Sequence, residues 1–127
     1  MVVTDTAQDD IRDDAIAYIQ STFTHIAVGD DNTTPVGGDT TLGNELKREV
    51  FVETSGPTNG VYVMSMRLST TELNGSTIKE VGIFDASSGG TMLCRLLTTE
   101  YAKTSDKEVW IDVQFQIATG TFACVLG

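Results

Sequence analysis

The strictest pattern in this 127-residue chain is an alternation of apolar and polar residues over residues 108–118. Its apolar members are Val109, Ile111, Val113, Phe115 and Ile117. Successive side chains of a β-strand point to opposite faces, so a period of two predicts a strand with one face in a core and one face largely in water. Strands of this kind are typical of antiparallel sheets that are solvated on one side. The rest of the chain must therefore supply elements that cover the apolar face.

Six further stretches are rich in β-branched, aromatic or alternating residues and also predict strands. They are residues 22–28, 47–54, 61–68, 78–84, 92–97 and 121–126. The turn-rich segment SGPTNG joins the second of these stretches to the third, and the glycine-rich segment DASSGG joins the fourth to the fifth. Both arrangements predict antiparallel hairpins. The last stretch is expected at a sheet edge, in this chain or in a neighbouring one.

Residues 5–20 precede the strands and predict one short amphipathic helix. Asp5 or Thr6 can serve as its N-cap, and Asp9 stands where a capping box places an acid. Its apolar stripe consists of Ile11, Ala15, Tyr18 and Ile19. We expect this stripe to pack on the domain's own sheet, because a small sheet needs a cover on one face. The alternative is that the stripe docks on a neighbouring subunit.

Together these elements predict a mostly β protein: an antiparallel β-sandwich of about seven strands with one short N-terminal α-helix. The length of the chain corresponds to a single domain over residues 1–127, with the helix at 5–20 and the sandwich at 22–127. The first residues lack a basic and apolar leader, so no signal peptide is expected.

Charge excludes several classes of partner. The chain carries 18 acidic and 8 basic residues, for a formal net charge of -10. Such a surface repels phosphate backbones and anionic lipids, so we expect neither a nucleic-acid nor a membrane partner. The acidity has two interpretations that remain open: general solubility, or adaptation to high salt, where a carboxylate-rich surface stays hydrated and its self-repulsion is screened.

The loop at 29–41 is the one segment whose composition suggests a metal. Asp30, Asp31 and Asp39 supply carboxylates there, but their spacing does not match the DxDxDG pattern of a calcium loop. They are weak calcium candidates, and we expect neither a metal nor another cofactor. Turn residues account for the loop equally well, and Thr40 or Thr41 is expected to cap a helical turn over residues 42–45.

No arrangement typical of an enzyme is present in the sequence. The chain lacks the GxSxG, HExxH and P-loop patterns, and its single histidine, His25, lies in a predicted strand. Cys94 and Cys124 lack a CxxC spacing, and two free thiols are favoured over a disulfide. We therefore expect a protein that is not an enzyme. Trp110, on the wet face of the strand at 108–118, is a candidate interface residue; the alternative is that a loop or the helix partly covers it.

Two blocks of the sequence resemble tail-fibre and tail-collar-fibre domains of tailed phages. In the first block the matching residues are Ala27, Gly29, Thr34, Pro35, Asp39, Thr40, Leu42, Glu45 and Arg48. In the second block they are Glu80, Val81, Gly82, Ile83, Phe84 and Asp85, and Ala102–Lys103 follow before the alternating strand. The order and spacing of the blocks extend the resemblance over residues 23–118.

The resemblance implies a structural virion protein of the tail, baseplate or collar, or one that attaches a fibre. It implies assembly with copies of itself and with neighbouring virion proteins around a symmetry axis. Fibre proteins of this kind usually continue into a shaft and a tip, whereas this chain ends at Gly127, which favours a small adaptor or attachment subunit. Expected interface residues are Ile11, Tyr18, Trp110, Pro35 and Leu42. The alternative function is a carbohydrate- or receptor-binding sandwich that attaches a virion to a host surface.

Overall fold

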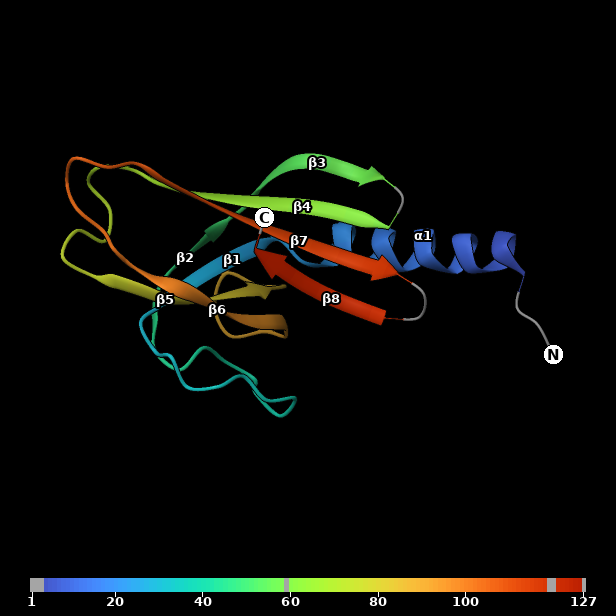
Figure 1. Cartoon of the computed structure of the whole chain (residues 1–127), viewed down its shortest axis with the longest axis horizontal. Helices are drawn as coiled ribbons and strands as arrows, with labels where there is room; N and C mark the ends of the chain where they lie inside the picture. Colours follow the sequence, from blue (N-terminus) through green and yellow to red (C-terminus); the bar gives the residue numbers. More distant parts are fainter. Residues whose placement is uncertain (1–3, 59, 119–120, 127) are drawn as a thin grey trace.

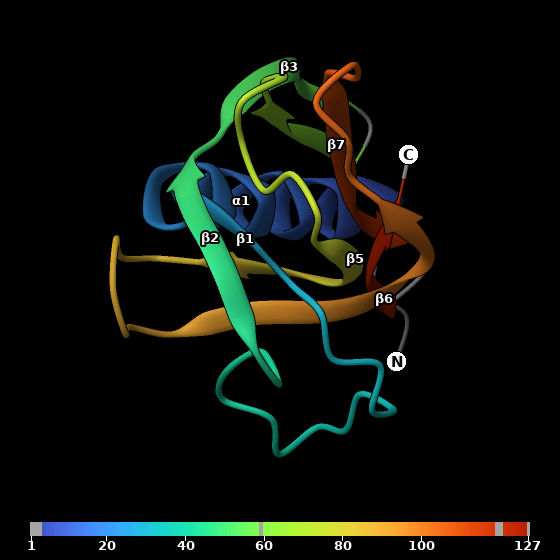
Figure 2. The same cartoon turned by 90° about the vertical axis from the view of Figure 1, so that its left-hand side faces the viewer.

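The computed structural model describes residues 4–58, 60–118 and 121–126, and within them the chain forms one helix and eight strands. These are α1 (Asp5–Thr22), β1 (His25–Gly29), β2 (Glu45–Val50), β3 (Val52–Thr58), β4 (Val61–Leu68), β5 (Thr77–Phe84), β6 (Met92–Ala102), β7 (Val109–Ala118) and β8 (Thr121–Leu126). The first sheet has the order β2–β1–β5–β6 and the second has the order β3–β4–β7–β8. Both are antiparallel, and α1 lies between the two layers (Figures 1 and 2). The predicted antiparallel sandwich with an N-terminal helix is confirmed.

The stretch at 47–54 was expected to form one strand, and it divides between the two sheets instead. β2 pairs with β1 in the first sheet, the chain breaks at Phe51, and β3 pairs with β4 in the second sheet. The Phe51 ring turns inward and meets the Tyr62 ring edge-on, with 6.4 Å between centroids. Alternation predicts which residues face a core but not which sheet a strand joins, so the crossing could not be foreseen. The backbone of residues 55–58, expected in a turn, belongs to β3.

The main core lies between the two sheets. β4 contributes alternate residues to this core, and β7 lies beside it with Met64 opposite Val113 and Met66 opposite Ile111. Antiparallel residues that lie directly opposite share a face, so the apolar sides of the two strands form one surface. The buried members of this core are Ile16, Ile19, Phe23, Ile26, Val28, Tyr62, Met64, Met66, Leu68, Ile78, Val81, Ile83, Ile111, Val113 and Phe115.

The start of α1 differs from the prediction. Its N-cap is Thr4, whose side-chain oxygen accepts a hydrogen bond from the backbone N–H of Ala7 at 3.3 Å. Asp5 and Thr6, the expected caps, are already inside the helix. At the other end the helix continues to Thr22, so the first strand begins at His25 rather than at residue 22.

The expected stripe of α1 is only partly buried. Ile16 and Ile19 are 1% and 7% exposed and belong to the main core, whereas Ile11 and Tyr18 are 65% and 62% exposed. The N-terminal half of α1 extends beyond the tips of β4 and β7 in Figure 1, so little of the sandwich lies beside it. Of the predicted stripe, packing on the domain's own core is therefore confirmed for Ile19; Ile16, which the prediction did not include, is the other buried residue of the helix. Among the described residues, no helix is both long and apolar enough to cross a membrane.

Two substitutions in α1 test this orientation. Ile16→Ala should lower the free energy of unfolding by about 2–4 kcal/mol, because it removes buried methyl groups and leaves a cavity. Ile11→Ala is the matched control and should change it by less than about 0.5 kcal/mol, because Ile11 faces water. Urea unfolding followed by circular dichroism measures both. Equal losses in the two variants would contradict the helix placement.

Candidate functional site

The outer face of the first sheet, on the side away from the main core, is covered by the loop at 30–44. Along β5 the residues alternate, so that Val81 and Ile83 enter the main core while Glu80 and Phe84 face outward. Phe84 forms a second, smaller core with Ala27 and Leu42. Because Leu42 belongs to the loop, this cluster fastens the loop to the sheet by apolar contact.

Glu80 fastens the same loop by hydrogen bonds. Its carboxylate is fully buried and accepts the backbone N–H groups of Asp31, Gly43 and Asn44 at 3.0, 2.7 and 2.9 Å. The guanidinium of Arg95, on neighbouring β6, donates to the same carboxylate at 2.9 Å. The two ends of the loop are thereby joined at one side chain, and a buried charge receives four donors.

Arg95 extends the network into the middle of the loop. Its side chain is 4% exposed and donates to the backbone oxygen of Thr33 at 2.8 Å. It also contacts the carboxylates of Asp31 and Asp39 at 3.3 and 3.4 Å. A planar guanidinium carries five N–H donors in a fixed fork, which allows one residue to hold several segments of chain at once. We call the pair Glu80 and Arg95 with its loop partners the loop anchor.

The anchor sets the ionisation of Glu80. Burial by itself raises the pKa of a carboxyl group, because it disfavours the charged form. The N–H groups of Asn44, Gly43 and Asp31 and the Arg95 guanidinium favour the charged form and outweigh burial, so the pKa of Glu80 lies below its ordinary value. The carboxylate is therefore the form that holds the loop.

Two glycines make room for the anchor. Gly29 lies opposite Glu80 in the sheet, and a Cβ atom built there would overlap the backbone oxygen of Asn44 and the Glu80 carboxylate. A Cβ atom on Gly82 would stand 2.8 Å from a Leu42 methyl carbon. The glycines in the Ala-x-Gly and Glu-Val-Gly-Ile-Phe segments are thus explained by close approach of the loop rather than by turn geometry.

Arg48, on β2, holds the other side of the outer face. Its guanidinium stacks on the Phe84 ring at 3.7 Å from the centroid and is paired with Glu45 through bonds of 2.7 and 3.2 Å. It also donates to the backbone oxygens of Ala86 and Gly89 at 2.9 and 2.8 Å, which fixes the β5–β6 turn. Glu45 was expected to end a helical turn over 42–45, and this was wrong: Glu45 opens β2, where Arg48 is its partner.

The acids of the loop are occupied within the protein. Asp31 and Asp39 face Arg95, and the Asp30 carboxylate accepts the side-chain amide of Asn44 at 2.6 Å. Asp31 also accepts the backbone N–H of Thr33 at 2.7 Å, and the side chain and the backbone N–H of Thr33 together lower the pKa of Asp31. Within the described ranges, no group of three or more His, Cys, Asp or Glu residues could hold a metal ion.

A second feature is an open apolar corner where α1, β6 and β8 meet. In the β7–β8 ladder Cys124 lies opposite Phe115 and Phe122 lies opposite Ile117, so the side of β8 that carries Phe122 is the core-facing side. Phe115 is nevertheless 5% exposed while Phe122 is 70% exposed. The two rings stack with 6.4 Å between centroids. One core-facing side of the sandwich therefore lacks a cover at its edge.

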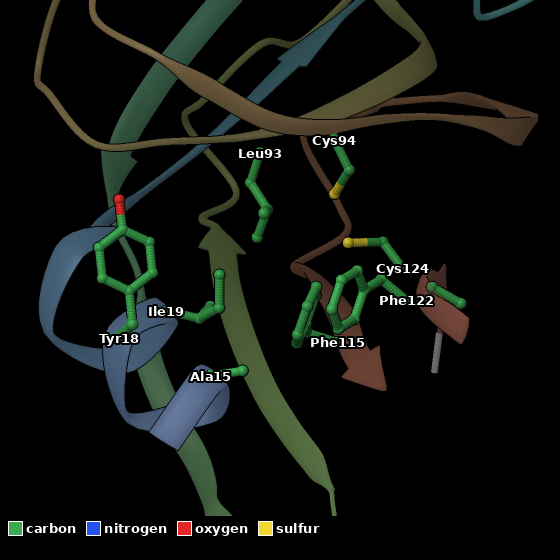
Figure 3. A pocket seen from close by; sticks show the side chains of 9 residues that line it. Ala15, Tyr18, Ile19, Leu93, Cys94, Phe115, Phe122 and Cys124 are labelled. Carbon is green, nitrogen blue, oxygen red and sulfur yellow. The ribbon is translucent and has the colours of Figure 1, made fainter. Parts of the chain in front are cut away.

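A pocket of about 380 Å³ opens at this corner (Figure 3). Its lining is almost entirely apolar and comes from α1, β6, β7 and β8; the residues are Ala15, Tyr18, Ile19, Leu93, Cys94, Phe115, Phe122, Ala123 and Cys124. Tyr18 stands at one wall of the pocket and Phe122 at the other. We call this region the apolar corner.

The structure does not bring the five expected interface residues together. Ile11 and Tyr18 are exposed on α1, and Tyr18 belongs to the apolar corner. Trp110 is 52% exposed, donates to Glu108 at 2.9 Å and lines a separate hollow of about 210 Å³ with Tyr101 of β6. Pro35 is half-buried in the loop. Leu42 is 4% exposed beneath the loop, and its side chain packs inside the domain against Ala27 and Phe84.

Two central residues, Arg95 and Phe122, were not anticipated from the sequence. The available signal for Arg95 was a cation within the apolar run MLCRLL, since a buried charge requires partners. For Phe122 the signal was a large aromatic residue in a terminal strand. Compared with protein-family models and with curated proteins, the chain matches none.

Glu80→Gln tests the loop anchor. The variant should unfold with a free energy about 3–5 kcal/mol lower at neutral pH, because Arg95 loses its buried countercharge. Glu80 has a depressed pKa in the folded state, so its contribution is complete above its ordinary value of 4.5 and is lost as the pH falls through the lower folded value. The gap between wild type and variant should therefore stay constant above about pH 5 and narrow below pH 4.5.

Urea unfolding at a series of pH values measures this gap. Glu100→Gln is the matched control, because Glu100 is exposed on β6, and it should shift stability by less than about 0.5 kcal/mol. The claim that Glu80 anchors the loop would be contradicted if Glu80→Gln lowered the free energy of unfolding no more than the control does. It would also be contradicted if the loss did not change with pH down to acid unfolding.

Proposed function

We propose that this chain is a non-enzymatic structural subunit of a tailed virus particle that mediates assembly or fibre attachment in the tail, baseplate or collar. The virion location rests on the resemblance to tail-fibre and tail-collar-fibre domains. Several of the residues that carry the resemblance have a common physical role, which supports treating the two sequence blocks as one signature. Glu80 belongs to the loop anchor, Gly29 makes room for it, and Leu42, Arg48 and Phe84 hold the same outer face.

The observation that carries the assembly part of the proposal is the apolar corner. The corner leaves a core-facing side of β8 open, and Phe122 there is 70% exposed. Burying apolar area releases about 25 cal/mol per Å², so an uncovered aromatic residue beside a pocket favours association. A single exposed aromatic residue is ordinary, but here it adjoins a pocket lined by eight other residues.

We assign a second copy of the chain as the partner at this corner. The chain carries the pocket itself, and it carries a projecting N-terminal half of α1 on which Ile11 is an exposed apolar side chain among several aspartates. A projecting ridge on one copy that enters a groove on the next makes a head-to-tail contact, and such contacts close into rings when the rotation permits. Rings of this type agree with assembly around a symmetry axis.

Phe122→Ser should weaken self-association at least roughly tenfold, because central aromatic residues dominate interface energies. Light scattering coupled to size exclusion measures the mass over a range of protein and salt concentrations. Association should strengthen with salt, because a net charge of -10 makes the copies repel one another and molar salt shortens the screening length to about 3 Å. Val50→Ser, at an exposed position of β2, is the control and should leave association unchanged.

A monomer at every protein and salt concentration would contradict the assembly proposal. It would then favour the alternative function, capture of a host-surface glycan or receptor. The observation in favour of this alternative is the hollow lined by Trp110 and Tyr101. Aromatic side chains of this kind offer a ligand apolar contact area together with a polar tip.

A further inference from the structure

The two cysteines of the chain meet at the apolar corner. Cys94 lies on β6 of the first sheet opposite Ile83, and Cys124 lies on β8 of the second sheet opposite Phe115. Ile83 and Phe115 both belong to the main core, so each cysteine is on the core-facing side of its strand. Both cysteines line the same pocket and both are free thiols. Residues far apart in the sequence, on different sheets, thus converge on one space.

The sulfur atoms point toward one another. Figure 3 shows the Cys94 sulfur directed from β6 down into the pocket and the Cys124 sulfur directed from β8 toward it. The thiols share a hydrogen bond, and this bond together with burial raises the pKa of Cys94. Cys94 therefore keeps its proton at neutral pH and is the poorer nucleophile in the first step of a thiol exchange.

We propose that Cys94 and Cys124 form an oxidation site, at which a small disulfide such as oxidised glutathione converts the two thiols into one intramolecular disulfide between β6 and β8. The two side chains face one another across the pocket, and the strands that carry them are in contact.

The reaction proceeds by two exchanges. The Cys124 thiolate attacks one sulfur of oxidised glutathione, a mixed disulfide forms on Cys124, and one glutathione thiolate leaves. Cys94 then loses its proton to water and attacks the Cys124 sulfur, which releases the second glutathione. Two protein thiols are oxidised and one glutathione disulfide is reduced to two thiols, so atoms and electrons balance.

The disulfide would change how β8 is held. β8 is an edge strand that pairs only with β7 within its sheet. A bond to β6 ties that edge to the opposite sheet beside the pocket and removes freedom from the unfolded chain. Oxidation should therefore stabilise the fold and fix one wall of the apolar corner.

The test is to incubate the folded, reduced protein with oxidised glutathione and follow its intact mass and melting temperature. We expect a loss of about 2 Da, protection of both cysteines from iodoacetamide, and a peptide map that joins Cys94 to Cys124. The melting temperature should rise by on the order of 10 °C, and dithiothreitol should reverse it. The same incubation in concentrated urea should give the disulfide more slowly.

Two single variants serve as matched controls. Cys94→Ser should accumulate one glutathione on Cys124. Cys124→Ser should take up glutathione more slowly, because burial, which remains in this variant, disfavours the thiolate of Cys94. In wild type, glutathione retained on both cysteines, no change in mass, or a covalent dimer would each overturn the proposal. A disulfide that leaves the melting temperature unchanged would contradict the claim that the bond stabilises the fold by tying β8 to β6. The incubation is run on dilute protein at low salt, where the net charge of -10 makes copies repel one another, so the readouts do not depend on whether a second copy covers the apolar corner.

Discussion

The contact between Glu80 and Arg95 is the interaction on which the outer half of the structure depends. A segment of fifteen residues without secondary structure of its own is long for a compact domain, and it stays ordered only if something holds it. Glu80 accepts hydrogen bonds from both ends of that segment, and Arg95 donates a hydrogen bond to its middle. A buried ion pair of this kind adds little to stability compared with an apolar pair of the same shape, but the loss of one partner is costly. Its main contribution is to specify one conformation of the loop.

Much of the fold follows from the period of two in the sequence. β7 has the predicted apolar face, and the β5–β6 hairpin has the predicted partners. Two features did not follow. The break at Phe51 depends on which sheet each half joins, and that is decided by pairing between distant residues. Which face of α1 is buried depends on where the helix lies relative to the strand tips. Ile11 and Tyr18 therefore match the spacing of an apolar stripe in the sequence but are exposed in the structure.

In the candidate sites, too, some residues could be identified from the sequence pattern and others only from the folded structure. Glu80, Gly82, Phe84 and Arg48 were identifiable as a pattern, yet their roles appear only when the loop is folded onto the sheet. Arg95 was not identifiable, because a single cation in a strand does not reveal its partners. The acids of the loop suggested calcium by composition, and two of them instead face Arg95. Composition reports which charges are present, whereas the fold decides which charges meet.

The outer face of the first sheet and the apolar corner therefore differ in character. The outer face is closed, with its charges paired and its apolar residues covered by the loop. The corner at β6 and β8 is open, apolar and lined by two thiols. A rigid, fully satisfied face suits a scaffold, and an open apolar edge suits a contact. The division agrees with the assembly role proposed above, in which the loop anchor would maintain the subunit and the apolar corner would be the contact surface.

Amide hydrogen exchange tests the anchor most directly. The backbone N–H groups of Asp31, Gly43 and Asn44 lie outside the strands and donate to one buried carboxylate. They should be protected as strongly as the amides of β5, while the amide of Gly38, exposed in the same loop, should exchange quickly. Exchange of those three amides at the rate of Gly38 would contradict the claim that Glu80 holds the loop.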